Sequence, residues 1–101
     1  MNKVFISVGM SGRSDEEVII DLDRAVGKIM DLFGEDEVKC ISNFGDIGPE
    51  DANRLWYLGH AIQRLGLCNI CYFTKGWQNY KGCKAEYEIC KLYGIEILEE
   101  S

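Results

Sequence analysis

The sequence predicts one α/β domain in which a parallel sheet is covered by helices on both faces. Short apolar runs alternate along the chain with segments whose apolar residues recur at helical spacing, and the links between them are short. A chain of 101 residues has room for one hydrophobic core, so residues 1–101 are expected to form a single domain.

The first half of the chain predicts a strand, a helix and a second strand. Residues 3–8 and 37–42 are apolar runs typical of strands. Between them, Ser14 and Glu17 have the spacing of a capping box, which begins a helix that Gly34 ends.

The second half predicts two further helices, each followed by a strand. Pro49 suits the first turn of a helix whose apolar stripe extends to Leu65. Residues 67–74 are apolar almost throughout, as in a central strand buried on both faces. A third helix over residues 82–93 leads into a short strand over residues 95–98. The residues expected to face inward on this third helix are Ala85, Ile89 and Leu92.

This order of elements predicts a flavodoxin-like (Rossmann-like) three-layer sandwich with four parallel strands in the order 2-1-3-4, because crossovers between parallel strands are right-handed. Ligands of such sheets bind beyond the carboxyl ends of the strands, near the point where the strand order reverses. The loops expected there are residues 9–14, 43–48 and 76–81, which are rich in Gly, Ser and Asn. A binding site is predicted among them.

Composition argues against several kinds of partner. The net charge is −6, and Lys and Arg are scattered rather than gathered on one face, so no polynucleotide partner is expected. No apolar stretch has the length of a membrane span and the first residues lack a signal-peptide pattern, which predicts a cytoplasmic protein without a membrane partner. A sheet this small is expected to leave helix faces with Trp56, Tyr57 and Leu58 only partly covered, which favours a homo-oligomer.

The five cysteines are expected to be structural. Their odd number argues against a disulfide framework. Cys68 and Cys71 form a CxxC pair, but a redox pair sits at a helix N-terminus and this one falls in a predicted strand. A zinc site would need ligands that the single histidine, His60, does not supply. No metal and no cofactor are predicted.

Glu86 is the candidate for chemistry. It falls near the start of the third helix, where a helix N-terminus favours a negative charge and keeps a carboxyl group ionised unless it is buried. An ionised carboxylate can attack an anomeric carbon and form a glycosyl-enzyme intermediate. The alternative is a glutamate that only stabilises the helix.

Several motifs make the chain resemble the nucleoside 2-deoxyribosyltransferase-like families, in particular their small bacterial and phage branch. Residues 4–12 (VFISVGMSG) are similar to the first strand and loop of these proteins. The later signature reads Trp56-Tyr57, Cys68-Asn69, Gly76-Trp77, Lys81-Gly82 and Glu86, with Gly94 at the expected distance, so that the resemblance covers nearly the whole chain.

The resemblance implies a pocket for a nucleoside or nucleotide and a possible cleavage or transfer of its N-glycosidic bond, with Glu86 as the catalytic nucleophile. Ser7, Gly9, Ser11 and Gly12 would hold the sugar or phosphate, Trp77 would stack on the base, and Tyr80 and Gly82 would border the pocket. Trp77 could equally anchor its loop on the core, and Arg13 could pair with a phosphate or be solvated.

Three supporting positions depart from the transferase pattern. Ala61 and Tyr80 stand where the family has carboxylates, and Phe5 stands where it has a tyrosine that orients the nucleophile. Two further hypotheses therefore stay open beside the enzyme: a binding module without turnover that senses or sequesters a nucleotide, and a structural or interaction protein with an acidic surface.

Overall fold

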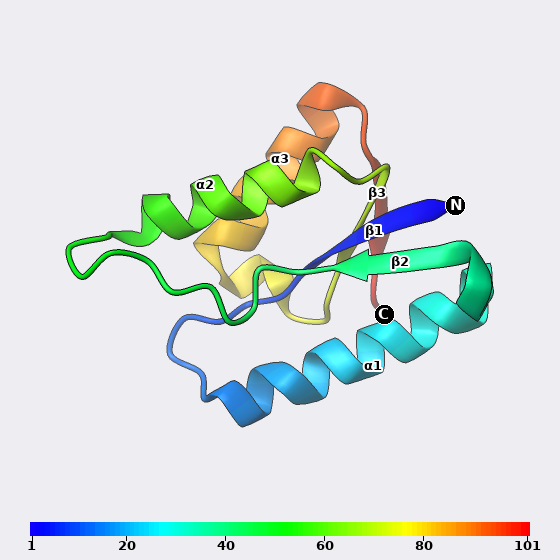
Figure 1. Ribbon diagram of the computed structural model, residues 1–101, viewed down its shortest axis with the longest axis horizontal. Coiled ribbons are helices and arrows are strands. Elements are labelled where there is room, and N and C mark those ends of the chain that lie inside the picture. The colour runs from blue at the N-terminus through cyan, green and yellow to red at the C-terminus, as the bar shows by residue number, and fades with distance from the viewer.

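Four parallel strands form the middle layer of the computed structural model, which describes residues 1–101 (Figure 1). The strands lie in the order β2-β1-β3-β4, as predicted. Their bounds are β1 Asn2–Ser7, β2 Val38–Ile41, β3 Ile70–Phe73 and β4 Glu96–Glu99. The central strands β1 and β3 pair with each other, with Val4 beside Ile70 and Ser7 beside Phe73.

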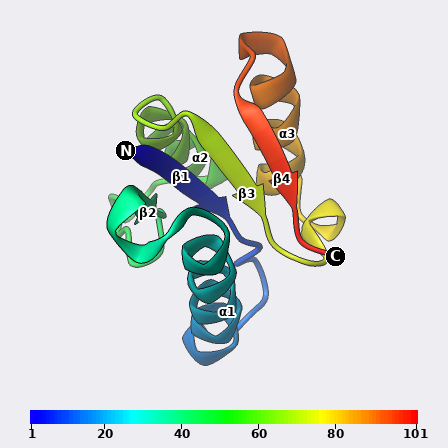
Figure 2. The same ribbon diagram turned by 90° about the vertical axis from the view of Figure 1, so that its right-hand side faces the viewer.

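Helices cover both faces of this sheet, which confirms the predicted three-layer α/β fold. α1 (Asp15–Phe33) lies on one face, and α2 (Arg54–Leu65) and α3 (Lys81–Tyr93) lie on the other (Figures 1 and 2). None of the three helices combines the length and the hydropathy that a membrane-spanning segment needs.

The sheet separates two hydrophobic clusters because successive side chains of a strand point to opposite faces. Val4 and Ile6 of β1 pack with Ala25 and Ile29 of α1. Phe5 of β1 belongs to the cluster on the other face. The other members of that second cluster come from α2, β3, the turn after β3 and α3: Ala61, Leu65, Cys71, Phe73, Trp77, Cys83 and Cys90.

Polar caps set the start of the first two helices. The Ser14 hydroxyl accepts a hydrogen bond from the Glu17 amide, and the Glu17 side chain accepts one from the Ser14 amide, so the predicted capping box is present. The predicted start of α2 at Pro49 is wrong. The helix begins at Arg54 because the Asn53 side chain accepts a hydrogen bond from Leu55, whereas Pro49 lies in the preceding turn.

Two other predictions need correction in detail. The third strand begins at Ile70 rather than residue 67, because the amides of Leu67 and Cys68 bond back to the end of α2 and form a turn. On α3, Leu92 points outward with 78% of its surface exposed, and the helix buries Cys83, Glu86 and Cys90 instead. The inward face of α3 therefore differs from the one predicted by hydrophobicity alone.

The cysteines are all free, and Cys71, Cys83 and Cys90 are buried. Cys71 and Cys90 have no exposed surface and pack in the cluster between the sheet and helices α2 and α3. This is the small-hydrophobe role that the sequence predicts for them. Cys68 lies in the turn before β3 rather than within the strand.

Glu100 ties the end of β4 to α1. Its carboxylate accepts two hydrogen bonds from the Arg24 guanidinium, at 2.7 and 3.0 Å, and one from the Lys75 amide at 2.9 Å. Lys28 pairs with it at 3.2 Å, and the Tyr72 hydroxyl donates to it at 3.3 Å. Although its side chain is only 1% exposed, the Arg24 bonds outweigh burial and lower the pKa of Glu100 to about 2.

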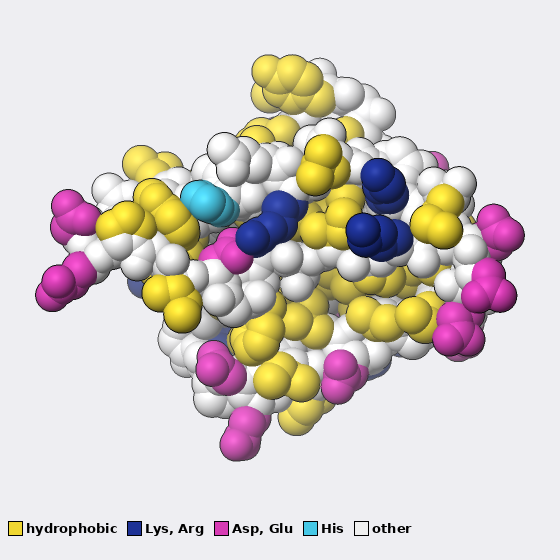
Figure 3. Space-filling view, viewed as in Figure 1, with side chains coloured by type: hydrophobic (Ala, Val, Ile, Leu, Met, Phe, Trp, Pro, Cys, Tyr) yellow, Lys and Arg dark blue, Asp and Glu magenta, His cyan; other side chains and the backbone are white.

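Acidic side chains lie over α1, over the turn that follows it and over the loop before α2, as Figure 3 shows for one face of the molecule. Lys and Arg side chains on this face form a small group over α2 and the strands rather than a continuous stripe. The α1 sequence carries Asp15, Glu16 and Glu17 in its first turn, where the helix dipole favours negative charge.

Replacing Glu100 by Gln should destabilise the fold in a pH-dependent way. The stabilisation by Glu100 is present above pH 4.5 and is lost as the pH falls through about 2, because the paired carboxylate must then take up a proton. We expect Glu100→Gln to lower the free energy of unfolding by about 2 kcal/mol at pH 7, allowing for the solvent around Arg24, and by little at pH 2.

Urea unfolding at both pH values measures this difference. The exposed Glu96 of β4 supplies the control, since Glu96→Gln should change stability by less than about 0.5 kcal/mol at either pH. An equal loss for Glu100→Gln at pH 2 and pH 7 would contradict the role of the ionised carboxylate.

Candidate functional site

Three buried polar residues, Ser7, Thr74 and Glu86, lie at the carboxyl ends of β1 and β3. Ser7 is the last residue of β1, and Thr74 follows β3 directly. The Thr74 hydroxyl donates to the Ser7 carbonyl at 3.3 Å. This is the edge of the sheet, near the reversal of strand order, at which open α/β folds bind ligands.

Glu86 reaches this edge from α3. It lies in the second turn of the helix with 6% of its surface exposed. The Ser7 hydroxyl donates a hydrogen bond to Glu86 Oε1 at 2.5 Å, which is as short as charge-assisted bonds between hydroxyl and carboxylate groups become. Ser7, predicted to contact a ligand, thus contacts the predicted nucleophile.

Burial changes the protonation of this carboxyl group. Loss of solvation raises the pKa of Glu86 to about 7, and the hydrogen bond from Ser7 opposes that rise. Its titratable neighbours are the thiols of Cys71, Cys83 and Cys90, and burial raises the pKa of the Cys83 thiol to about 11. Near neutral pH, Glu86 is therefore present partly as the neutral acid and partly as the carboxylate. The expectation that the helix N-terminus keeps it ionised holds only for an exposed carboxyl group.

The second carboxyl oxygen of Glu86 is the one that remains available. The hydrogen bond from Ser7 engages Oε1, and the structure shows none to Oε2. No fully enclosed side-chain oxygen or nitrogen lacks a partner. Oε2 is therefore not fully enclosed and has no hydrogen-bond partner.

The loop between β1 and α1 borders the site. Ser11 and Gly12 are exposed, and Gly12 has a φ of +75°, a conformation that suits glycine. Arg13 donates to the Gly9 carbonyl at 2.9 Å and pairs with Asp21 at 2.7 Å. Arg13 thus holds the loop on α1 and is engaged within the protein.

Tyr80, which directly precedes α3, packs against the loop between β1 and α1. Its ring lies directly against the backbone of Gly9, where a Cβ atom would overlap it. The Arg13 guanidinium lies 6.0 Å from the ring centroid. Gly9 and Tyr80 are thus in contact, and the contact fills the space above Gly9.

Trp77 packs into the core. Its indole stacks on Tyr87 with ring centroids 4.5 Å apart, contacts Phe73 at 5.1 Å, and donates from Nε1 to Glu99 at 3.1 Å. Only 8% of the residue is exposed. The structure therefore matches the loop-anchor alternative, and it offers no open ring face for a base.

The N-terminus of α3 is open. No side chain caps it and no acidic residue lies in its first turn. The space beside Gly82 is empty within 4 Å of the position of a Cβ atom, and Lys81 and Lys84 are exposed. Unpaired amide groups at a helix N-terminus attract anions, so this end of α3 suits a phosphate or a sugar hydroxyl.

Two positions that depart from the transferase pattern are core residues here. Ala61 is 1% exposed and Phe5 is fully buried, both in the cluster between the sheet and helices α2 and α3. His60 lies outside the site, stacked on Trp56 with centroids 4.0 Å apart. Sequence reasoning missed Thr74, and the only available signal was its place at the end of the apolar run.

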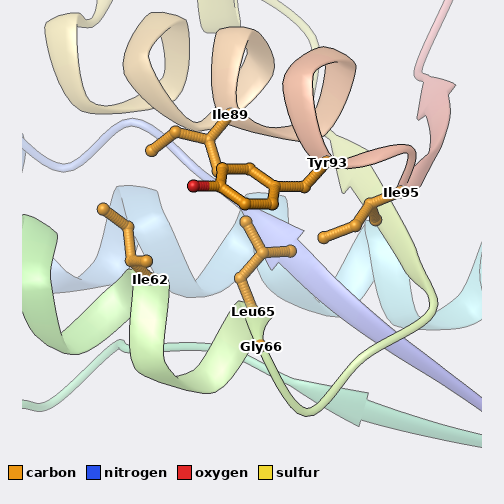
Figure 4. Close-up of a pocket in the computed structure, with 6 residues that line it drawn as sticks. All are labelled: Ile62, Leu65, Gly66, Ile89, Tyr93 and Ile95. Carbon is orange, nitrogen blue, oxygen red and sulfur yellow. The ribbon is translucent and has the colours of Figure 1, made fainter.

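A separate apolar groove lies between α2 and α3 (Figure 4). Its volume is about 400 Å³, and it is lined by Ile62, Leu65, Gly66, Ile89, Tyr93 and Ile95. Four of these residues lie in the carboxyl-terminal halves of the two helices, while Gly66 follows α2 and Ile95 precedes β4, at the amino-terminal edge of the sheet. The groove is therefore distinct from the edge at which Glu86 and Ser7 meet.

Comparisons of the chain with protein-family models, with curated proteins and with solved structures find no match.

Replacing Glu86 by Gln should stabilise the protein at high pH. With a pKa of about 7 in the folded state against 4.5 when unfolded, the native protein binds more protons between these values, so its stability falls as the pH rises through this window. Gln stays neutral. The stability of Glu86→Gln relative to wild type should therefore be greater at pH 8 than at pH 4.5 by about 3 kcal/mol.

Denaturant unfolding at the two pH values tests this expectation. Glu88, exposed on the same helix and paired only with Lys91, gives the control variant Glu88→Gln, which should show no such change. A pH-independent difference between Glu86→Gln and wild type would show that the buried group is not the one that titrates.

Gly9→Ala should destabilise the protein through Tyr80. The added methyl group would overlap the ring, and overpacking of this kind costs about 1–3 kcal/mol. In a Tyr80→Ala background the cost of Gly9→Ala should fall near zero, as a double-mutant cycle in chemical unfolding measures. Gly82→Ala, which enters open space, serves as the control. An equal cost in both backgrounds would exclude the contact as the cause.

Proposed function

We propose that the chain binds a nucleoside or nucleotide at the carboxyl edge of β1 and β3, in the manner of the nucleoside 2-deoxyribosyltransferase-like proteins that it resembles. The observation that supports this most is Glu86: a carboxylic acid buried on α3, hydrogen-bonded to the end of β1, with one oxygen left accessible. A purely structural glutamate gains little from such a place, because burying its charge is unfavourable.

The surroundings of Glu86 suit the parts of such a ligand. The exposed hydroxyl of Ser11 and the backbone of Gly12 can bind sugar or phosphate oxygens. The uncapped N-terminus of α3, with Gly82 in its first turn, favours a phosphate. Tyr80 is the aromatic residue left to contact the base, and its ring would have to leave Gly9 to admit a ligand.

Turnover would proceed through Glu86 as nucleophile. The ionised carboxylate attacks the anomeric carbon, the bond to the base breaks, and its electron pair leaves with the base, which takes a proton from water. Water then hydrolyses the glycosyl ester, or a second base accepts the sugar. Because the pKa of Glu86 is about 7, the reactive form increases as the pH rises through 7.

A binding module without turnover is the second candidate. The positions of two family carboxylates hold Ala61, buried in the core, and Tyr80, packed on Gly9. Neither can protonate a departing base as a carboxylic acid would, and such assistance contributes roughly 10²–10⁴ in rate. The same site could then sense or sequester its ligand.

Incubation with a panel of deoxynucleosides and nucleoside monophosphates separates the two candidates. If Glu86 is the nucleophile, chromatography should detect free base, Glu86→Gln should abolish its release, and Glu88→Gln should not. The rate should rise about tenfold per pH unit below pH 7.

Thermal unfolding with the same panel tests binding by itself. A ligand at 100 times its Kd adds about 2.7 kcal/mol, which corresponds to roughly 11–22 °C for a domain of this size. Stabilisation without base release supports the binding module. Neither stabilisation nor base release with any member of the panel would refute the proposed function.

A further inference from the structure

The hydrogen bond from Ser7 to Glu86 joins the end of β1 to α3, between residues 79 positions apart in the sequence. Ser7 ends the central strand β1, beside Phe73 of β3, and is 1% exposed. Its carbonyl accepts hydrogen bonds from both the amide and the hydroxyl of Thr74, at 3.1 and 3.3 Å. The backbone that carries the Ser7 hydroxyl is therefore held from the neighbouring strand.

We propose that Ser7 is a positioning residue for Glu86: its hydroxyl holds Oε1 against the end of β1 and leaves Oε2 as the oxygen that reacts. For turnover, this inference rests on the proposed function. The contact itself can be tested whether or not the protein releases a base.

Ser7 is the only residue that donates a hydrogen bond to the carboxyl group of Glu86. A glutamate side chain has several rotatable bonds, so a single short bond to a fixed donor restricts the carboxyl plane considerably. The structure shows no second hydrogen bond to the carboxyl group. The other titratable groups that face it are thiols, Cys71 from β3 and Cys83 and Cys90 from α3. The side-chain hydrogen bond with Cys90, together with burial, raises the pKa of Cys71, and burial raises the pKa of Cys83.

A hydroxyl donor also favours the carboxylate over the neutral acid, because a hydrogen bond to a charged acceptor is roughly twice as strong as one between neutral groups. Ser7 thus opposes the effect of burial on Glu86. Removing the hydroxyl should release the carboxyl group and make it harder to ionise. If Ser7 only filled space, removing its hydroxyl would neither release the carboxyl group of Glu86 nor make it harder to ionise.

Carbon-13 NMR titration of the Glu86 carboxyl tests the contact. Ser7→Ala should raise the titration midpoint by about one pH unit, while Ser7→Thr, which keeps a hydroxyl on the same carbon, should stay close to wild type. Thr74→Val is the matched control: it removes the neighbouring buried hydroxyl, which bonds only to backbone, and should leave the midpoint in place. An unchanged midpoint in Ser7→Ala, or an equal shift in Thr74→Val, would overturn the proposal.

Base release by the same variants tests the consequence for turnover. Ser7→Ala should lower kcat about tenfold with little change in KM and move the pH profile to higher pH, and Ser7→Thr should restore most of the rate. A rise in KM alone would assign Ser7 to ligand binding and refute the positioning role. If wild type releases no base from any substrate, the proposed reaction fails, while the NMR titration still decides whether Ser7 positions Glu86.

Discussion

The burial of β1 and β3 on both faces is the constraint on which the rest of the structure depends. Both strands are paired on each side, and their side chains enter two hydrophobic clusters, one under α1 and one under α2 and α3. A parallel sheet of this kind needs helices on both faces to exclude water. The right-handed crossovers then bring the loops after β1 and β3 to one edge, where the buried polar residues lie.

A carboxyl group at this edge conflicts with the hydrophobic interior around it. Glu86 lies on the same helix face as Cys83 and Cys90, and the protein accommodates it by raising its pKa and by one hydrogen bond from Ser7. Functional carboxyl groups commonly combine burial with one specific partner, although structural networks also do so. Here the accessible oxygen and the open N-terminus of α3 favour the functional interpretation.

The loops around Glu86 are held by contacts within the protein. Arg13 is bonded to the Gly9 carbonyl and to Asp21, and Tyr80 rests on Gly9. A ligand would therefore replace contacts that the free protein already makes, and its affinity would be reduced by the cost of moving Tyr80. Glu100 illustrates the opposite arrangement: an acid near the chain end whose pKa falls because cations and an amide surround it.

Local signals in the sequence were enough for the fold. The capping box at Ser14 and the apolar run before Thr74 predicted the first helix and the buried central strand, because caps and side-chain alternation act within a few residues. Pro49 misled the prediction of α2, since Asn53 caps that helix more effectively.

The sequence by itself determined the strand order, the edge of the sheet at which a site could form, and Glu86 as its candidate reactive carboxylate. Tertiary structure decided which face of α3 is buried, and with it the exposure of Leu92 and the burial of Glu86. It also placed Trp77 in the core and brought the Ser7 hydroxyl within hydrogen-bond distance of the Glu86 carboxyl group. Helical periodicity shows which residues share a face, but only the elements packed against that face determine how far each side chain is removed from water.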